Sequence, residues 1–205
     1  MIKLKWLGHS CMKLMWDEYT VIFDPFEDGY VPGLNPIRET ADMVLCSHGH
    51  GDHNAAHLVA ITEGKKAPFE VTALETYHDD AQGTLRGMNT VYLLQGDGFK
   101  IVHMGDIGCP LTEEQYEMLR GADIVMTPVG GFYTAEPDVI KKMMDEIGAN
   151  VVVPMHYSSG TFGFDVIKPV SVYTELCNEV VMYAGDELVI TKDMERQTAV
   201  LMYVE

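Results

Sequence analysis

One stretch, residues 47–53, constrains this chain more than any other, because it concentrates side chains that bind metals. It contains His48, His50, Asp52 and His53, separated by glycines. Three histidines and an aspartate this close together are hard to explain as ordinary core or surface, since buried polar groups without partners are costly. Imidazole and carboxylate suit zinc, manganese or iron better than calcium. We therefore predict a metal site here.

The stretch follows an apolar run at residues 43–46, which has the length of a buried strand. We expect Gly49 and Gly51 to allow a tight turn, because glycine tolerates a positive φ. A strand that ends in such a turn can direct its side chains into one cavity. The first two histidines would then serve one cation, and the aspartate and last histidine a second.

Length and charge bound the functions that this chain can have. Its 205 residues are enough for one sizeable core, so we expect a single domain over residues 1–205. The net charge of −17 disfavours a phosphate backbone, so nucleic acid is not an expected partner. No apolar run approaches the roughly 20 residues that span a bilayer, so no membrane partner is expected. A homo-oligomer is possible.

The cysteines and the N-terminus indicate the compartment. The four cysteines are widely spaced, form no CxxC pair and are expected to be free thiols in a reducing compartment. They are Cys11, Cys46, Cys109 and Cys177. The first six residues alternate like a strand and not like a signal peptide. We expect a cytoplasmic protein.

The hydrophobic pattern predicts runs of strands separated by a few helices. Strands are expected at 3–7, 11–16, 19–23, 43–46, 69–74, 90–94, 99–104, 124–127, 151–153 and two or three times within 180–204. Helices are expected at 54–62, 112–119, 139–147 and 169–177, the second with a capping box that begins at Thr112. This order favours an α/β fold in which two mixed sheets pack face to face with helices outside.

Three further candidate ligands, His78, Asp106 and His156, lie just past predicted strands. Strand ends can converge at one rim of a sandwich, so these side chains can meet the 47–53 stretch. Asp106 lies between glycines, and its two carboxylate oxygens can each bind one cation. Asp24 precedes Pro25 and is typical of a turn or a loop cap. We expect His57, on the predicted helix 54–62, to be a surface or packing residue.

These motifs resemble the metallo-β-lactamase superfamily over most of the chain. Residues 48–53 fit its HxHxDH signature, Gly105-Asp106 fits the strand with the bridging aspartate, and His156 fits the last ligand histidine. Residues 6–11, 23–25 and 103–106 are most similar to a branch of small single-domain metal-dependent hydrolases. That branch includes relatives of the L-ascorbate-6-phosphate lactonase.

The resemblance implies an αβ/βα four-layer sandwich of two mixed β-sheets flanked by helices, with a dinuclear metal site between the sheets. The implied ligands are His48, His50 and His78 for the first metal, Asp52, His53 and His156 for the second, and Asp106 as the bridge. His103 competes with His78 as third ligand, but we favour a role in which it orients the ligands. His9 resembles a residue near the metals.

The implied function is a metal-dependent hydrolase that cleaves an ester, lactone or phosphoester bond of a small, anionic metabolite. Two divalent ions, Zn²⁺ first and Mn²⁺ or Fe as alternatives, would activate a hydroxide. Asp52 would accept a proton from the nucleophile, and His9, His103 or a metal-bound water would protonate the leaving group. No other cofactor is expected. An anion could be attracted by Arg86, Arg38 and Lys168, although we expect each of them to be an exposed surface residue.

Two alternatives stay open. A di-iron oxidoreductase on the same fold usually replaces the second histidine of the motif by a carboxylate, whereas His50 is present here and no flavin domain is attached. A non-catalytic metal-binding protein would keep the site without turnover. The identity of the metal separates the first alternative from hydrolysis, and turnover separates the second.

Overall fold

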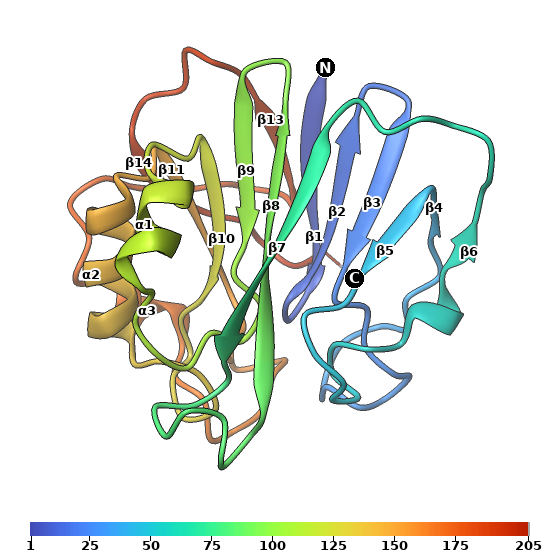
Figure 1. Ribbon diagram of the computed structural model, residues 1–205. Coiled ribbons are helices and arrows are strands. Elements are labelled where there is room, and N and C mark those ends of the chain that lie inside the picture. The colour runs from blue at the N-terminus through green and yellow to red at the C-terminus, as the bar shows by residue number, and fades with distance from the viewer. Residues whose placement is uncertain (205) are drawn as a thin grey trace.

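The computed structural model describes residues 1–204, in which two mixed β-sheets pack face to face (Figure 1). The chain begins with an antiparallel meander of β1 (Ile2–Gly8), β2 (Cys11–Trp16) and β3 (Tyr19–Phe23). Alternate residues of β1 are buried, as the alternation of apolar and polar residues predicts for a strand with one face on the core.

The first sheet has the order β13-β1-β2-β3-β5. Its edges are β13 (Glu187–Ile190), which pairs antiparallel with β1, and β5 (Met43–Leu45), which pairs parallel with β3. Because β5 ends at Leu45, the 47–53 stretch begins at the end of this sheet.

The second sheet has the order β12-β14-β11-β10-β9-β8-β7. Its strands are β7 (Glu70–Tyr77), β8 (Met88–Gly96), β9 (Phe99–His103), β10 (Ile124–Pro128), β11 (Val151–Met155), β12 (Val180–Met182) and β14 (Gln197–Val200). Every residue of β10 and β11 is buried, as expected for parallel strands covered on both faces. Asp97 and Gly98 both have positive φ in the turn between β8 and β9, which confirms the predicted hairpin.

The core between the sheets combines residues from distant parts of the chain. Trp6 and Trp16 of the first sheet are almost fully buried in one cluster with Leu93, Val125 and Val153 of the second. Trp6 also donates a hydrogen bond from Nε1 to the carbonyl of His9 (2.9 Å). This bond ties the core to the turn between β1 and β2, where a candidate site residue lies.

Three helices lie on the outer side of the second sheet (Figure 1). They are α1 (Glu113–Leu119), α2 (Pro137–Ile147) and α3 (Val170–Thr174). The capping box of α1 is confirmed: Thr112 Oγ1 accepts from the backbone N–H of Gln115 (3.3 Å), and Gln115 Oε1 accepts from the N–H of Thr112 (2.9 Å). None of the helices in residues 1–204 is long and apolar enough to cross a bilayer.

Replacing Thr112 with alanine should destabilise the protein by about 1 kcal/mol, because the first turn of α1 loses the hydroxyl that accepts from its backbone. Urea unfolding of both proteins measures the difference, at equal metal content. A free energy of unfolding equal to that of the wild type would contradict the capping role.

The predicted helix at 54–62 is wrong. The structure has a short 3₁₀ turn, η1 (Ala56–Leu58), and then β6 (Ala60–Ile61), which pairs parallel with β4 (Thr40–Ala41). Between residues 54 and 62, only Ala55 and Val59 are buried, so a helix there would have little apolar surface to bury.

The outer face of the first sheet is instead covered by a loop over residues 24–39. Phe26, Val31, Leu34 and Ile37 of this loop pack in a second hydrophobic cluster with Ile22 of β3. Within residues 1–204, all α-helices lie on the other sheet (Figure 1). The two mixed sheets are therefore as predicted, and the helical layer is present on one side.

Candidate metal centre

The first group of candidate ligands consists of His48, His50 and His78, whose nearest ring nitrogens all lie within 4.8 Å of one another. His48 is half-buried and His50 is exposed, whereas His78 is buried. His78 directly follows β7, so the end of the second sheet brings it opposite the stretch that follows β5. The structure thus brings together the three residues predicted as one set.

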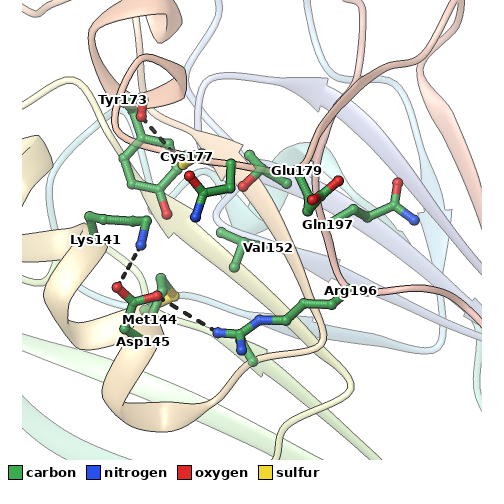
Figure 2. Close-up of a pocket in the computed structure, with 12 residues that line it drawn as sticks. Lys141, Met144, Asp145, Val152, Tyr173, Cys177, Glu179, Arg196 and Gln197 are labelled. Carbon is green, nitrogen blue, oxygen red and sulfur yellow. Dashed lines mark hydrogen bonds and ion pairs between the residues drawn. The ribbon is translucent and has the colours of Figure 1, made fainter.

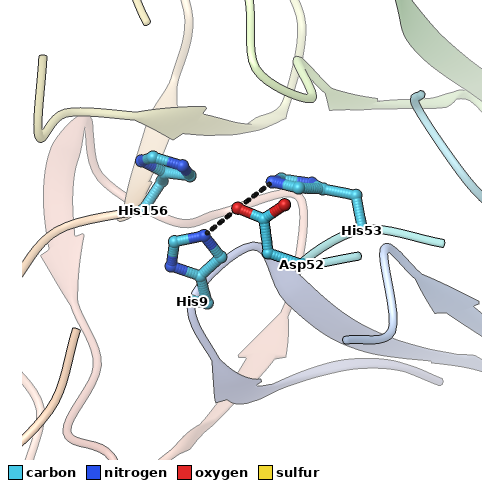
Figure 3. A group of neighbouring side chains, drawn as sticks. All are labelled: His9, Asp52, His53 and His156. Carbon is cyan, nitrogen blue, oxygen red and sulfur yellow. Dashed lines mark hydrogen bonds and ion pairs between the residues drawn. The ribbon is translucent and has the colours of Figure 1, made fainter. Parts of the chain in front are cut away.

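A second group of four buried residues contains His9, Asp52, His53 and His156, also within 4.8 Å (Figure 3). Asp52 Oδ2 lies 3.3 Å from His9 Nε2 and 3.6 Å from His53 Nε2. His156 directly follows β11, and His9 lies between β1 and β2. The group contains the three residues predicted for the second metal, together with His9.

Asp106 lies between the two groups. Its Oδ2 is 3.1 Å from His53 Nε2 and from His156 Nε2, and 3.4 Å from His78 Nε2. It also forms a third possible ligand group with His48 and His53. One buried carboxylate therefore touches residues of both groups, which is the geometry that a bridging ligand requires.

Asp24 orients one histidine of each group. Its carboxylate lies 2.8 Å from His53 Nδ1 and accepts from the hydroxyl of Ser47 (2.7 Å), whose oxygen lies 2.9 Å from His48 Nδ1. The backbone N–H of Ser47 also donates to Asp24 (2.6 Å). With the protons of both rings on Nδ1, each Nε2 has a free lone pair, and such carboxylate contacts fix metal-binding histidines in this tautomer.

The buried atoms at the centre fit a metal. Within residues 1–204, His48 Nε2, His53 Nε2, His156 Nε2 and Asp106 Oδ1 are buried and have no hydrogen-bond partner. His53 Nε2 faces Asp106 Oδ2 at 3.1 Å, so with a neutral ring a lone pair meets a carboxylate oxygen, and a cation bound between them would stabilise both. Nitrogen and oxygen donors in this arrangement suit a divalent transition metal.

The local electrostatics agree with this assignment. Burial lowers the pKa of His53, but Asp106 and Asp24 outweigh it and raise that pKa well above the ordinary value, so the site attracts positive charge. Burial, helped by His53, lowers the pKa of His48 to about 3. His48 is therefore neutral at neutral pH, which is the form of imidazole that binds metals.

Three site residues adopt a backbone conformation that is rare for residues with side chains. His9, Asp24 and His156 have φ of 51°, 43° and 53°. Such strained positions cluster at functional sites and persist only where the surroundings hold them. Gly105 has φ of 55°, and a Cβ there would lie 2.3 Å from Asn89 Oδ1, so the turn before Asp106 needs a glycine.

The 47–53 stretch turns tightly, as expected, since the N–H of His53 donates to the carbonyl of His50 (2.9 Å). The expected reason is wrong, because neither Gly49 nor Gly51 has a positive φ. At Gly51 the missing side chain leaves room for a neighbour instead, because a Cβ there would lie 2.7 Å from the ring of Tyr30. Gly49 has open space around it.

His103 lies outside the three ligand groups. It is buried with its ring stacked on Phe23 (4.8 Å, 4°), Nε2 lies 3.0 Å from the carbonyl of Ser10, and Nδ1 accepts from the N–H of Gly105 (3.2 Å). Both ring nitrogens are therefore engaged with the backbone. His57 is also outside the groups, and its exposed ring lies 3.6 Å from Glu27.

Sequence reasoning missed Asn89. Its buried amide accepts from the N–H of Asp106 (2.8 Å) and donates to Thr76 Oγ1 (2.9 Å) and to the carbonyl of Met104 (3.0 Å). These bonds hold the backbone of Asp106 in place. An asparagine near the end of a polar loop carries no signal of this role in the sequence.

The metal centre opens into a cavity of about 400 Å³. It is lined by Tyr30, His50, Asp52, His78, Arg86, Asp106, Tyr133 and Phe164. Another cavity, of about 330 Å³, lies away from the centre beside α2 and α3 (Figure 2). Three of its charged side chains, Lys141, Asp145 and Arg196, pair with one another, and none of the candidate ligand groups found among residues 1–204 lies there.

Known proteins identify the family. A family model described as the beta-lactamase superfamily domain matches residues 3–156. A crystal structure of a proposed zinc-dependent hydrolase of the metallo-β-lactamase superfamily from Thermotoga maritima is 31% identical, covers 98% of both chains and has a TM-score of 0.80. This chain belongs to the metallo-β-lactamase superfamily. The predicted family and its fold of two mixed sheets are confirmed.

Two other proteins are similar to this chain, one in sequence and one in fold. A relative from Methanopyrus kandleri, named UPF0173 metal-dependent hydrolase, is 26% identical over 198 residues, with 78% of this chain and 85% of the relative covered. A diiron β-hydroxylase from Streptomyces venezuelae shares the metallo-β-lactamase fold at 13% identity and a TM-score of 0.55, over 76% of this chain and 44% of the hydroxylase. Neither name mentions a lactone, so the likeness to a lactonase stays a prediction.

Proposed function

We propose that this metal-dependent hydrolase uses two divalent cations to cleave an ester, lactone or phosphoester bond of a small molecule. One cation would bind to His48, His50 and His78, and the other to Asp52, His53 and His156. The observation that carries the proposal is Asp106, a buried carboxylate in contact with histidines of both groups. Zinc fits these nitrogen and oxygen ligands best, with manganese and iron as alternatives.

When bound, the cations would lower the pKa of water towards about 7 and polarise the oxygen that gains charge during hydrolysis. The chain supplies the proton acceptor. Asp52 lines the cavity, and although burial opposes its charge, His53 and His9 lower the pKa of its carboxyl below the usual range. Asp52 is therefore ionised, can accept a proton from the attacking water and can return it to the leaving group.

His9 and His103 are better suited to positioning than to proton transfer. His9 is buried behind Asp52 and is not among the residues that line the cavity. Burial and His156 lower its pKa to about 4, so His9 is neutral and its Nε2, 3.3 Å from Asp52, can hold that carboxylate or join the second cation. His103 binds the backbone with both nitrogens and would fix the turn that presents Asp106.

A small-molecule substrate fits the cavity of about 400 Å³, which is within the usual range for such ligands. The net charge of −17 disfavours a nucleic acid. We retain the cytoplasm as the proposed location, because the four cysteines are unpaired.

Metal analysis and turnover together test the proposal. Protein purified without chelator should contain about two zinc or manganese ions per chain and should hydrolyse at least one class among aryl esters, lactones and phosphodiesters. Chelation should abolish turnover, and added metal should restore it. Two metals without turnover of any class would favour a non-catalytic protein, and two irons with redox activity would favour the oxidoreductase.

A further inference from the structure

The cavity at the metal centre is lined by two chemically different kinds of side chain. The first kind is candidate ligands, among them Asp52, and the second kind is three aromatic rings and one guanidinium. The rings belong to Tyr30, Tyr133 and Phe164, and the guanidinium to Arg86. From the sequence, Arg86 is expected to be an exposed surface residue. In the structure it is half-buried and forms part of the cavity wall.

Arg86 has no ion-pair partner among residues 1–204. Each of the other three arginines pairs with a carboxylate: Arg38 with Asp28, Arg120 with Glu117 and Arg196 with Asp145. An unpaired arginine is unexpected in a chain with 31 acidic and 14 basic residues. Its five N–H donors are therefore available to a ligand, and their planar arrangement matches a carboxylate or a phosphate.

The loop that carries Arg86 is held by a buried carboxylate. Asp79 accepts hydrogen bonds from the backbone N–H groups of Ala81, Gly83, Leu85 and Arg86, at 2.7 to 3.0 Å. The loop is therefore folded around this carboxylate, which positions the backbone of Arg86 before any ligand arrives.

The same loop is fixed to the metal centre. The N–H of His78 donates to the carbonyl of Gly87 (3.0 Å), and Gly108 lies so close that a Cβ there would be 2.2 Å from the nitrogen of Asp79. The guanidinium carbon of Arg86 lies 5.7 Å from the centre of the Tyr133 ring. The arginine and a candidate ligand are thus parts of one rigid unit.

We propose that Arg86 binds an anionic group of the substrate, a carboxylate or a phosphate, that is distinct from the bond cleaved at the metals. The three aromatic rings would pack against an apolar or planar body between these two points. This inference rests on the proposed function and adds a substrate class, small organic anions with an aromatic or apolar body. The neighbouring cavity on the far side of Arg86 carries Asp79, Asp80 and Glu136, so an anion would approach from the metal side.

Binding of simple probes to the zinc-loaded protein tests the inference without turnover. The probes are benzoate, phenylphosphonate, whose P–C bond is not hydrolysed, and neutral benzamide, and calorimetry gives their dissociation constants. For Arg86→Ala we expect the constants of the anions to rise by about 10-fold or more, since a charge-assisted hydrogen bond is lost. Benzamide binding and zinc content should not change. The anion with the larger loss identifies which group the arginine prefers.

Two further variants sharpen the result. Arg120→Ala removes an arginine that is paired on the surface, and it should leave all three constants unchanged. Arg86→Lys keeps the charge but not the planar fork, so it should restore only part of the anion binding.

Three results would overturn the inference: unchanged anion binding in Arg86→Ala, equal loss of benzamide binding, or no binding of either anion by the wild type. Failure of the proposed function has a different signature, because it appears as absent hydrolysis while the binding pattern persists.

Discussion

Asp106→Ala should release at least one metal and lower kcat/KM by more than about 100-fold. Substitution of residues that only orient metal ligands already lowers metal affinity or activity by about 10- to 100-fold, and Asp106 is a proposed ligand itself. Asp106 touches His53, His156 and His78, so its loss affects both proposed cations at once. Elemental analysis after gel filtration measures the metal content, and steady-state kinetics on the best ester or lactone measures the activity.

His57→Ala is the control for this prediction. His57 is a histidine close in sequence to the motif, but it is exposed and lies outside the ligand groups. Its substitution should change neither metal content nor kcat/KM. Equal effects of the two substitutions would contradict the ligand assignment.

Asp24→Asn should lower the affinity for both metals by about 10- to 100-fold, although Asp24 is not a proposed ligand. The carboxylate accepts from the ring of His53 directly and reaches the ring of His48 through Ser47. Oδ2 of Asp24 accepts from His53 and from the Ser47 hydroxyl, and Oδ1 accepts from the backbone N–H of Ser47. An amide has one oxygen and one NH₂ donor, so either the Ser47 N–H or both Oδ2 contacts lose their acceptor, and the support of the two imidazoles is disturbed. Competition with a chelator of known affinity measures the two metal dissociation constants.

Asp28→Asn is the matched control, because Asp28 is an exposed aspartate that pairs only with Arg38. It should leave both dissociation constants as in the wild type. If Asp24→Asn binds both metals as tightly as the wild type, Asp24 does not set the tautomers of the histidines.

Much of the fold could be predicted from local patterns. The meander β1–β3 follows from alternating apolar residues, the hairpin at Asp97 from a turn that needs positive φ, and α1 from its capping box. The helix predicted at 54–62 is absent because the structure of this segment depends on tertiary contacts. The loop over residues 24–39 covers the outer face of the first sheet, and β6 within the segment pairs with β4. The helix predicted at 169–177 is shorter in the structure, Val170–Thr174.

The candidate ligands could be predicted because their signals are local. Each lies in the motif or just past a strand, and strand ends at one rim converge. The residues that support them could not be predicted. Asp24 acts on His53, 29 positions away, and Asn89 on Asp106, 17 positions away, so only the folded chain brings these partners together. The role of Arg86 depends likewise on which side of the loop faces the cavity.

Anomalous diffraction from crystals of the zinc-loaded protein tests the central claim most directly. The account predicts two anomalous peaks, one among His48, His50 and His78 and one among Asp52, His53 and His156, with Asp106 in contact with both. One peak in either group alone, or peaks outside both groups, would contradict a dinuclear centre bridged by Asp106.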